Sequence, residues 1–277
     1  MHVLSVRWAQ CLLGGALLLA MPTARAACER SYRIPMWNLG YASFLEADGS
    51  PRGFIGDLYS ELARRSGCVL QFEAIPMARI NAMVQTHQIA FRGPAGVVRP
   101  EEDPQTVFIP MMRDCIELLV RKSLPARFSL DEPPPAAMVF GRLNGAGYGK
   151  WVERYLEQLP KPQVQLVNTV DSLYRMLEAG RIHATFANAY VYRWQLKHLQ
   201  LEDSFDVLPV PHAGYTAIGI KIDPKAMTAA DFSLLARQLE AIRDDGSFAR
   251  MIARHLGEAQ AAEYTAHQAG LPRQTGR

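Results

Sequence analysis

The chain has 277 residues, with 30 lysines and arginines against 27 aspartates and glutamates, and four cysteines. Two of the arginines, Arg7 and Arg25, lie in the first 26 residues, which hold no acid, so the other 251 residues carry 28 basic and 27 acidic side chains. A net charge this close to zero excludes the strongly basic surface that attracts a nucleic acid or an anionic membrane. The length allows one large α/β domain or two lobes of ~100–150 residues, each with its own core.

The N-terminal segment has the pattern of a secretory signal peptide. Arg7 precedes an apolar run from Cys11 to Met21, and Ala24-Arg25-Ala26 supplies a small-x-small cleavage signal. The run is about half of the ~20 residues that a membrane-spanning helix needs. We therefore expect residues 1–26 to be removed, leaving a periplasmic protein without a membrane anchor. Cys28 follows closely, but the residues before it lack the aliphatic side chain that lipidation uses.

Three cysteines remain after cleavage, in an oxidising compartment that permits disulfides. Cys28 and Cys68 each precede a predicted strand, and parallel strands that start side by side bring such residues within bridging distance. We therefore expect a Cys28–Cys68 disulfide. Cys115 lies in an apolar run, which favours a small buried thiol.

The first half of the chain alternates short β-rich runs with amphipathic segments, as in βαβ units with a largely parallel sheet. In one helix Leu58 and Leu62 share a face, and Gly67 ends it. The predicted elements are strands at Tyr32 to Trp37 and Val69 to Ile75, helices at 56–67 and Ala78 to Gln85, and an apolar stretch at Cys115 to Val120.

A proline-rich stretch, Asp131-Glu-Pro-Pro-Pro-Ala136, then separates a second compact unit, because three prolines fit neither a helix nor a central strand. The predicted strands after it are Ala137 to Leu143, Val164 to Val167, Ile182 to Phe186, Phe205 to Val210 and Ala217 to Ile222. The predicted helices are Lys150 to Leu159, Asp171 to Ala179, Tyr190 to Leu199, Ala229 to Arg243 and Ser247 to His255.

A series of segments occurs in an informative order: Tyr41-Ala-Ser-Phe44, Gly53-Phe-Ile-Gly-Asp57, Ile75-Pro-Met-Ala-Arg79, Phe108-Ile-Pro110 and Leu177-Glu-Ala-Gly180-Arg181. Over about residues 30 to 256 this order resembles the bacterial extracellular solute-binding proteins of the amino-acid-binding type (family 3). The resemblance implies a type II periplasmic-binding-protein fold: two α/β lobes, each a mostly parallel sheet flanked by helices, joined by two crossing strands. Lobe one would comprise residues 27–121 and 214–277, and lobe two residues 122–213.

The family binds its ligand in a cleft between the lobes, where the carboxyl ends of the strands meet. By position, Tyr41 and Phe44 would contact the ligand there, or else pack in the core. Arg79 would point a guanidinium fork at a ligand carboxylate, or else lie exposed on its helix.

The two family anchors for an amino acid are altered in this chain. Ungapped counting places Glu102 where relatives have the arginine that binds the ligand carboxylate. Arg99 takes that role only if the loop shifts by three residues, Arg92 is a further candidate, and a solvated loop is the remaining reading. Asn188 stands where relatives have the acid that binds the amino group. An amide adds no charge, which departs from recognition of a standard zwitterionic amino acid.

Gly145, Ala146 and Gly147 precede a lobe-two helix and could form a nest of backbone amides for an anionic group. They do not form a dinucleotide fingerprint, because Gly149 arrives one residue too early for G-x-G-x-x-G. The histidines are scattered, and no H-E-x-x-H, C-x-x-C or G-x-S-x-G motif occurs. The sequence thus predicts neither a cofactor nor a metal.

We therefore expect a monomeric protein that closes on a small polar or anionic solute, an amino acid or related carboxylate, and delivers it to an inner-membrane ABC permease. One alternative is an enzyme on the same fold, such as a dehydratase of a cyclic acid, with Glu102 or His212 as acid or base. Another is an accessory or sensory protein whose closed form is read by a membrane partner.

Overall fold

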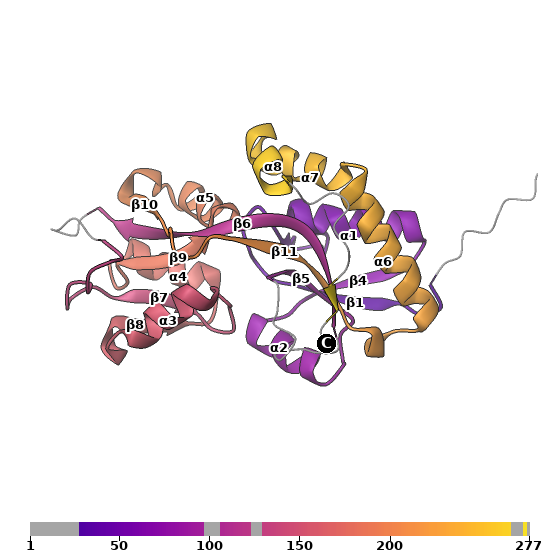
Figure 1. Cartoon of the computed structure of the whole chain (residues 1–277), viewed down its shortest axis with the longest axis horizontal. Coiled ribbons are helices and arrows are strands. Elements are labelled where there is room, and N and C mark those ends of the chain that lie inside the picture. The colour runs from indigo at the N-terminus through magenta and orange to yellow at the C-terminus, as the bar shows by residue number, and fades with distance from the viewer. Residues whose placement is uncertain (1–27, 97–105, 123–128, 267–273, 276–277) are drawn as a thin grey trace, which may run out of the picture.

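The computed structural model describes residues 28–96, 106–122, 129–266 and 274–275. Figure 1 shows two lobes, with the strands β6 (Val107–Arg121) and β11 (Tyr215–Ile222) running from one to the other. The first and last parts of the chain form one lobe, and the middle forms the second. This is the two-lobe α/β arrangement with two crossing strands that the resemblance implies.

Lobe one contains a parallel strand pair with a disulfide just before it. β1 (Tyr32–Met36) pairs with β4 (Leu70–Ala74), and Tyr32 lies opposite Leu70. The disulfide joins Cys28 and Cys68, whose Cα atoms are 4.8 Å apart, and Cys115 is a free thiol. The predicted cysteine pairing is confirmed, because strands that start side by side bring the residues before them together.

The helix α1 (Gly53–Ser66) follows the pattern read from the sequence. Phe54, Leu58 and Leu62 are fully buried on one face, and Gly67 ends the helix in the left-handed conformation, with φ 72°. The other elements of this part are the two-stranded hairpin of β2 (Phe44–Leu45) and β3 (Pro51–Arg52), the helix α2 (Met77–Gln85) and the strand β5 (Phe91–Gly96).

The strand β6 is long enough to belong to both lobes. Its first part pairs antiparallel with β11, from Val107 opposite Ile222 to Cys115 opposite Tyr215, and β11 pairs on its other side with β5. Its last part pairs with strands of lobe two. Since β6 is hydrogen-bonded into both sheets, a movement of one lobe relative to the other must bend it.

In lobe two, β7 (Phe140–Leu143) lies between β8 (Val164–Val167) and β9 (Ala184–Asn188), parallel to both. The strands β9 and β10 (Phe205–Pro209) both pair antiparallel with the last part of β6. The helices of this lobe are α3 (Lys150–Gln158), α4 (Val170–Glu178) and α5 (Ala189–Leu199), and short 3-10 turns lie at Lys161–Gln163, Glu202–Ser204 and Pro224–Ala226.

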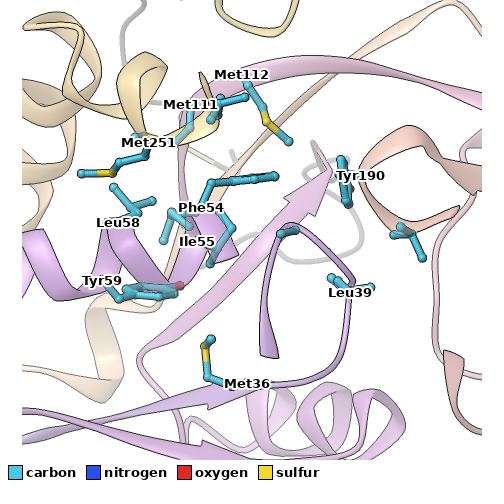
Figure 2. Packing of buried hydrophobic residues seen from close by; sticks show 14 of the residues in the cluster. Met36, Leu39, Phe54, Ile55, Leu58, Tyr59, Met111, Met112, Tyr190 and Met251 are labelled. Atoms are coloured by element: carbon cyan, nitrogen blue, oxygen red, sulfur yellow. The ribbon is translucent and has the colours of Figure 1, made fainter. Parts of the chain in front are cut away.

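Three C-terminal helices return to lobe one: α6 (Ala229–Asp244), α7 (Ser247–Leu256) and α8 (Glu258–Thr265), followed by the short strand β12 (Gln274–Thr275). Helices α6 and α7 pack on α1, and α8 packs on β6. Figure 2 shows Met251, Leu58 and Met111 in one apolar cluster that also includes Tyr190 of α5. Lobe two thus contributes an aromatic ring to the core of lobe one. Within the described ranges, no helix is long and apolar enough to cross a membrane.

The structure differs from the sequence prediction in several elements, among them the short strands β2, β3 and β12, and in strand direction. The strand β5 was missed because its sequence, Phe-Arg-Gly-Pro-Ala-Gly, is rich in strand-breaking residues, and the helix α8 and the first half of β6 were also missed. The expected parallel pairing holds for β1–β4, β7–β8 and β7–β9. Among the described strands, every pair that includes β6 or β11 is antiparallel, so the sheets are mixed rather than mostly parallel.

Candidate functional site

A cavity of about 1200 Å³ lies between the two lobes. Leu143 and Asn188, which end the parallel strands β7 and β9, line it on the side of lobe two. Residues of β5, β6 and β11 line it on the side of lobe one and the crossing strands. A crevice at the carboxyl ends of parallel strands is where open α/β folds bind their ligands.

Asp114 of β6 is the buried acid of this cleft. Its side chain is 2% exposed, the Asn188 amide donates to its Oδ2 at 2.8 Å, and the Cys115 backbone N–H donates to its Oδ1 at 2.9 Å. Burial raises the pKa of the Asp114 carboxyl to about 7, and the nearby charge of Glu117 acts in the same direction. The carboxyl therefore changes its charge near neutral pH.

Aromatic side chains line much of the cleft: Trp37, Tyr148, Trp151, Tyr174 and Tyr190. The Tyr174 side chain is fully buried, and its hydroxyl has no hydrogen-bond partner in the described part of the chain. The same holds for the indole N–H of Trp37. Because buried polar groups are normally paired, each of these two groups needs a hydrogen-bond partner that the described residues do not supply.

Five basic residues line the cleft, and two of them lie on β5 and β11, away from Asp114. Arg92 of β5 and Lys221 of β11 are opposite each other in the strand register, and Lys221 is 3% exposed. On β11 the residue opposite Asp114 is Thr216. Lys221 is five residues further along, roughly 17 Å at the usual rise of a strand. Along these strands the cleft therefore has an acidic end at Asp114 and a basic end at Arg92 and Lys221.

The loop of Gly145, Ala146 and Gly147 lies in the cleft lining, and one of the nearby amides already has an acidic partner. Glu153 of α3 accepts a hydrogen bond from the Tyr148 N–H at 2.9 Å and pairs with Arg142 at 2.6 Å. The Ala146 N–H donates to the Leu143 carbonyl. The chain's own carboxylate thus occupies part of the expected anion nest, as a helix N-terminus allows.

The remaining predicted site residues are divided by the structure. Arg92 and Asn188 line the cleft with the glycine loop, whereas Tyr41, Phe44 and Arg79 do not. The Tyr41 N–H donates to the Tyr190 carbonyl, the Phe44 ring packs at 6.0 Å from that of Trp194, and Arg79 is exposed on α2. These positions fit the alternatives given for these residues from sequence, which were core packing for Tyr41 and Phe44 and exposure on the helix for Arg79. Arg99 and Glu102 lie outside the described residues.

Sequence reasoning missed Asp114 and Tyr174. The signal for Asp114 was present: it is an acid between Met111-Met112-Arg113 and Cys115-Ile116, inside an otherwise apolar stretch. The sequence prediction treated this stretch as a strand only from Cys115 onward. A strand extended by a few residues would have placed a carboxylate within the sheet, where an acid needs a specific reason to be.

His212 lies at the rim of the cleft and is half exposed. Its ring stacks on Trp151 with centroids 5.3 Å apart, and its Nε2 lies 3.1 Å from an Asp131 carboxylate oxygen. This is the one His–Asp contact of the described residues that lies against the cleft. A histidine oriented by a carboxylate is a group that can move protons.

No family model and no curated protein matches the sequence. A substrate-binding protein of an ABC uptake transporter from Streptococcus pneumoniae, with bound histidine, is 16% identical with a TM-score of 0.68, and the match covers 82% of this chain and 93% of that one. The arginine-, lysine-, histidine-binding protein ArtJ from Geobacillus stearothermophilus is 14% identical with a TM-score of 0.68, over 82% and 96%. A histidine kinase sensor domain with similarity to periplasmic binding proteins is 15% identical with a TM-score of 0.67, over 82% and 96%.

At these sequence identities, the likeness is one of fold. The crossing strands, the mixed sheets and the cleft between the lobes all belong to that common architecture. The chain therefore has the type II periplasmic-binding-protein fold, which it shares with amino-acid-binding proteins of ABC uptake systems.

Proposed function

We propose that this protein binds a small polar solute in the cleft between its lobes, without transforming it, and closes on the solute by bending at β6 and β11. The observation that carries the proposal is the large cleft lined by buried polar groups at the junction of the two lobes. The pattern of the first 26 residues supports export to the periplasm. In that compartment the solute-loaded protein would deliver its cargo to an ABC permease.

Contacts between the lobes support closure around the cleft. Asn38 donates to Asp171 at 3.1 Å, and Asn81 donates to the Gly145 carbonyl at 3.1 Å. Each bond joins lobe one to lobe two and is lost when the lobes separate. Closure removes the solute from water, which strengthens each hydrogen bond made to it.

We retain residues 27–121 with 214–277 as lobe one and 122–213 as lobe two in this proposal. We propose that one monomer binds one solute, and the lining of the cleft by residues of a single chain supports this. Arg92, Asn188 and the glycine loop remain proposed ligand contacts because they line the cleft. Of the three arginines predicted from sequence, Arg92 is thus the one to substitute first, with the exposed Arg79 as its matched control.

Thermal-shift screening of the mature protein against amino acids, amines and carboxylates tests the proposal. A solute at 100 times its Kd should add about 2.7 kcal/mol to the free energy of unfolding. Isothermal titration then gives the affinity of each hit. No stabilisation by any of the three solute classes would contradict solute binding.

The Asp131–His212 contact at the rim favours one second candidate, an enzyme on the same fold. This candidate predicts that a bound solute is converted. Mass spectrometry of the solute after long incubation distinguishes the enzyme from the binding protein, because a binding protein leaves its solute unchanged. His212→Ala should then leave the affinity for the solute within about twofold if the exposed rim contact is not used.

The likeness to a histidine kinase sensor domain raises a third use of the same binding event. A sensory protein would bind its solute as tightly as a transport protein does, but its closed form would be recognised by a signalling partner. Capture of membrane partners with the solute-loaded protein, compared with the solute-free protein, separates transport from sensing.

A further inference from the structure

We propose that Asp114, held by Asn188, binds a cationic nitrogen group of the solute, so that the cleft selects amines or guanidinium compounds over solutes that carry only negative charge. This inference rests on the proposed function and names the substrate class of the same cleft. It assigns the charge recognition to the crossing strand β6, and not to the end of β9, where this chain has an amide.

Asp114 is buried and has no cationic side chain as a partner among the described residues. It is 2% exposed, and no lysine, arginine or histidine of the described residues forms an ion pair with it. An ionised carboxylate is costly to bury unless it is paired. A cationic solute would supply the missing charge.

The groups that act on the Asp114 carboxyl itself are neutral or acidic, and two basic side chains of this region have partners of their own: Arg113 lies 4.5 Å from the centre of the Tyr215 ring, and Arg193 donates to Gln260. Cys115 and Glu117 lie on the same strand, Tyr190 comes from α5 and Tyr264 comes from α8. Arg92 and Lys221, the basic lining residues of β5 and β11, are several residues away along the neighbouring strands, and the other basic lining residues, Arg142, Lys150 and Arg154, belong to lobe two. The acidic end of the cleft is therefore suited to a positive charge and repels a negative one.

The Asp114 end of the cleft still has unused hydrogen-bond acceptor positions. An ionised carboxylate has about four acceptor positions, and Asn188 and the Cys115 amide use one each. Asn188 also lines the cleft, and its own carbonyl oxygen is a further acceptor. An ammonium or guanidinium group carries several N–H donors and so can use both side chains at once.

The aromatic side chains that line the cleft also suit a cationic solute, independently of Asp114. Tyr174 is fully buried and lines the cleft, and its hydroxyl has no partner among the described residues. A solute atom is the natural partner for such a hydroxyl. The faces of Tyr190 and Trp37, which also line the cleft, attract a cation through the ring quadrupole.

The test measures binding of three sets of probes to the parent protein and to single-residue variants. The amines are putrescine and agmatine, the zwitterions are L-arginine and L-histidine, and the carboxylates without nitrogen are succinate and glutarate. We expect stabilisation by at least one nitrogen-containing cation. Asp114→Asn keeps the shape of the side chain and the contact with Asn188 but removes the charge. It should lower the affinity for that cationic probe by about 30-fold or more.

Two further variants separate recognition from folding. The double variant Asp114→Asn with Asn188→Asp restores one carboxylate and one amide to the same hydrogen-bonded pair, so it should regain about tenfold of the lost affinity. Asp206→Asn removes an exposed acid from β10, a strand that pairs with β6, and should change the affinity by less than about twofold. Circular dichroism of each variant without probe verifies the fold.

Every outcome decides the question. If only succinate or glutarate binds, or if Asp114→Asn binds the cations as the parent does, the inference fails while solute binding stands. If no probe of any class binds the parent, the proposed function fails together with the inference. Loss of cation binding in Asp114→Asn with recovery in the double variant supports both.

Discussion

Asp114 and Glu153 are two of the three acidic residues that line the cleft, and their carboxylates have opposite surroundings. Glu153 of α3 is paired with Arg142 and also accepts a hydrogen bond from the Tyr148 amide, so its charge is balanced within the protein. Asp114 of β6 is more deeply buried, and its partners in the described part of the chain are neutral: the Asn188 amide, the Cys115 backbone N–H and the Tyr264 hydroxyl. Since a buried charge without a counter-ion costs stability, Glu153 is explained by the fold of lobe two, whereas Asp114 is explained by a solute.

The largest expected effect is the pH dependence of stability that Asp114 causes. Its pKa is about 7 in the folded protein and 3.8 without the protein environment. Between these values the folded state binds more protons, so the free energy of unfolding falls as the pH rises from about 4 to about 7. The loss is on the order of 4 kcal/mol, and Asp114→Asn should remove it.

Denaturant unfolding of the parent and of Asp114→Asn at several pH values measures this difference. The gain in stability of the variant over the parent should grow with pH and level off above about pH 7. Cys115, Tyr190 and Tyr264 next to Asp114 have raised pKa values and stay uncharged over this pH range in both proteins, so they do not contribute to the difference. Parallel pH profiles would show that Asp114 is not the buried acid that we describe.

The second effect concerns the balanced carboxylate. Glu153→Gln should lower the free energy of unfolding by about 1–2 kcal/mol, because it weakens the bond to the Tyr148 amide and breaks the pair with Arg142. Its affinity for a cationic solute should change by less than about threefold. Thermal unfolding and isothermal titration of the same preparation give both numbers. A large loss of affinity with unchanged stability would reverse the roles of the two carboxylates.

A smaller effect is expected at the unpaired hydroxyl of Tyr174. Tyr174→Phe removes a buried hydroxyl that has no partner among the described residues, so the free protein should be unchanged or more stable by up to about 1 kcal/mol. If the hydroxyl bonds to the solute, the affinity falls by roughly fivefold. Tyr155→Phe is the matched control, because its hydroxyl is also buried and unpaired but is not in the cleft lining. Equal affinity in both variants would exclude Tyr174 from solute binding.

The smallest effect uses Cys115 as a reporter of its neighbour. Burial raises the pKa of the Cys115 thiol to about 11, and the Asp114 charge adds to this rise. Asp114→Asn should therefore lower that pKa and increase the rate of alkylation at mildly alkaline pH by about two- to threefold. Mass spectrometry of iodoacetamide-treated protein follows the rate, and Glu153→Gln should leave it unchanged. An unaltered rate in Asp114→Asn would mean that the Asp114 charge is screened from its neighbour.

Features that depend on local sequence patterns could be predicted from the sequence, and the surroundings of Glu153 are one example. The pattern around Glu153 is local: it lies in a predicted helix, just after a glycine-rich loop, and acids in the first turn of a helix bind backbone amides. Cys28 and Cys68 were paired from sequence for a similar reason, because each lies just before a strand whose direction the βαβ pattern fixes. The α1 face of Phe54, Leu58 and Leu62 likewise follows from helical periodicity.

The amino-acid sequence by itself determined the order of the main elements and the disulfide, since periodicity, turn residues and strand starts are local properties of the chain, and the order of its segments implied the two-lobe α/β fold through their resemblance to solute-binding proteins. Only the tertiary structure decided which polar residues meet in the cleft. Asp114 and Asn188 are 74 residues apart in the chain and become hydrogen-bonded because β6 and β9 are antiparallel neighbours. The same long-range packing leaves Tyr41, Phe44 and Arg79 outside the cleft lining, because the register between strands of two lobes depends on contacts that no local pattern contains.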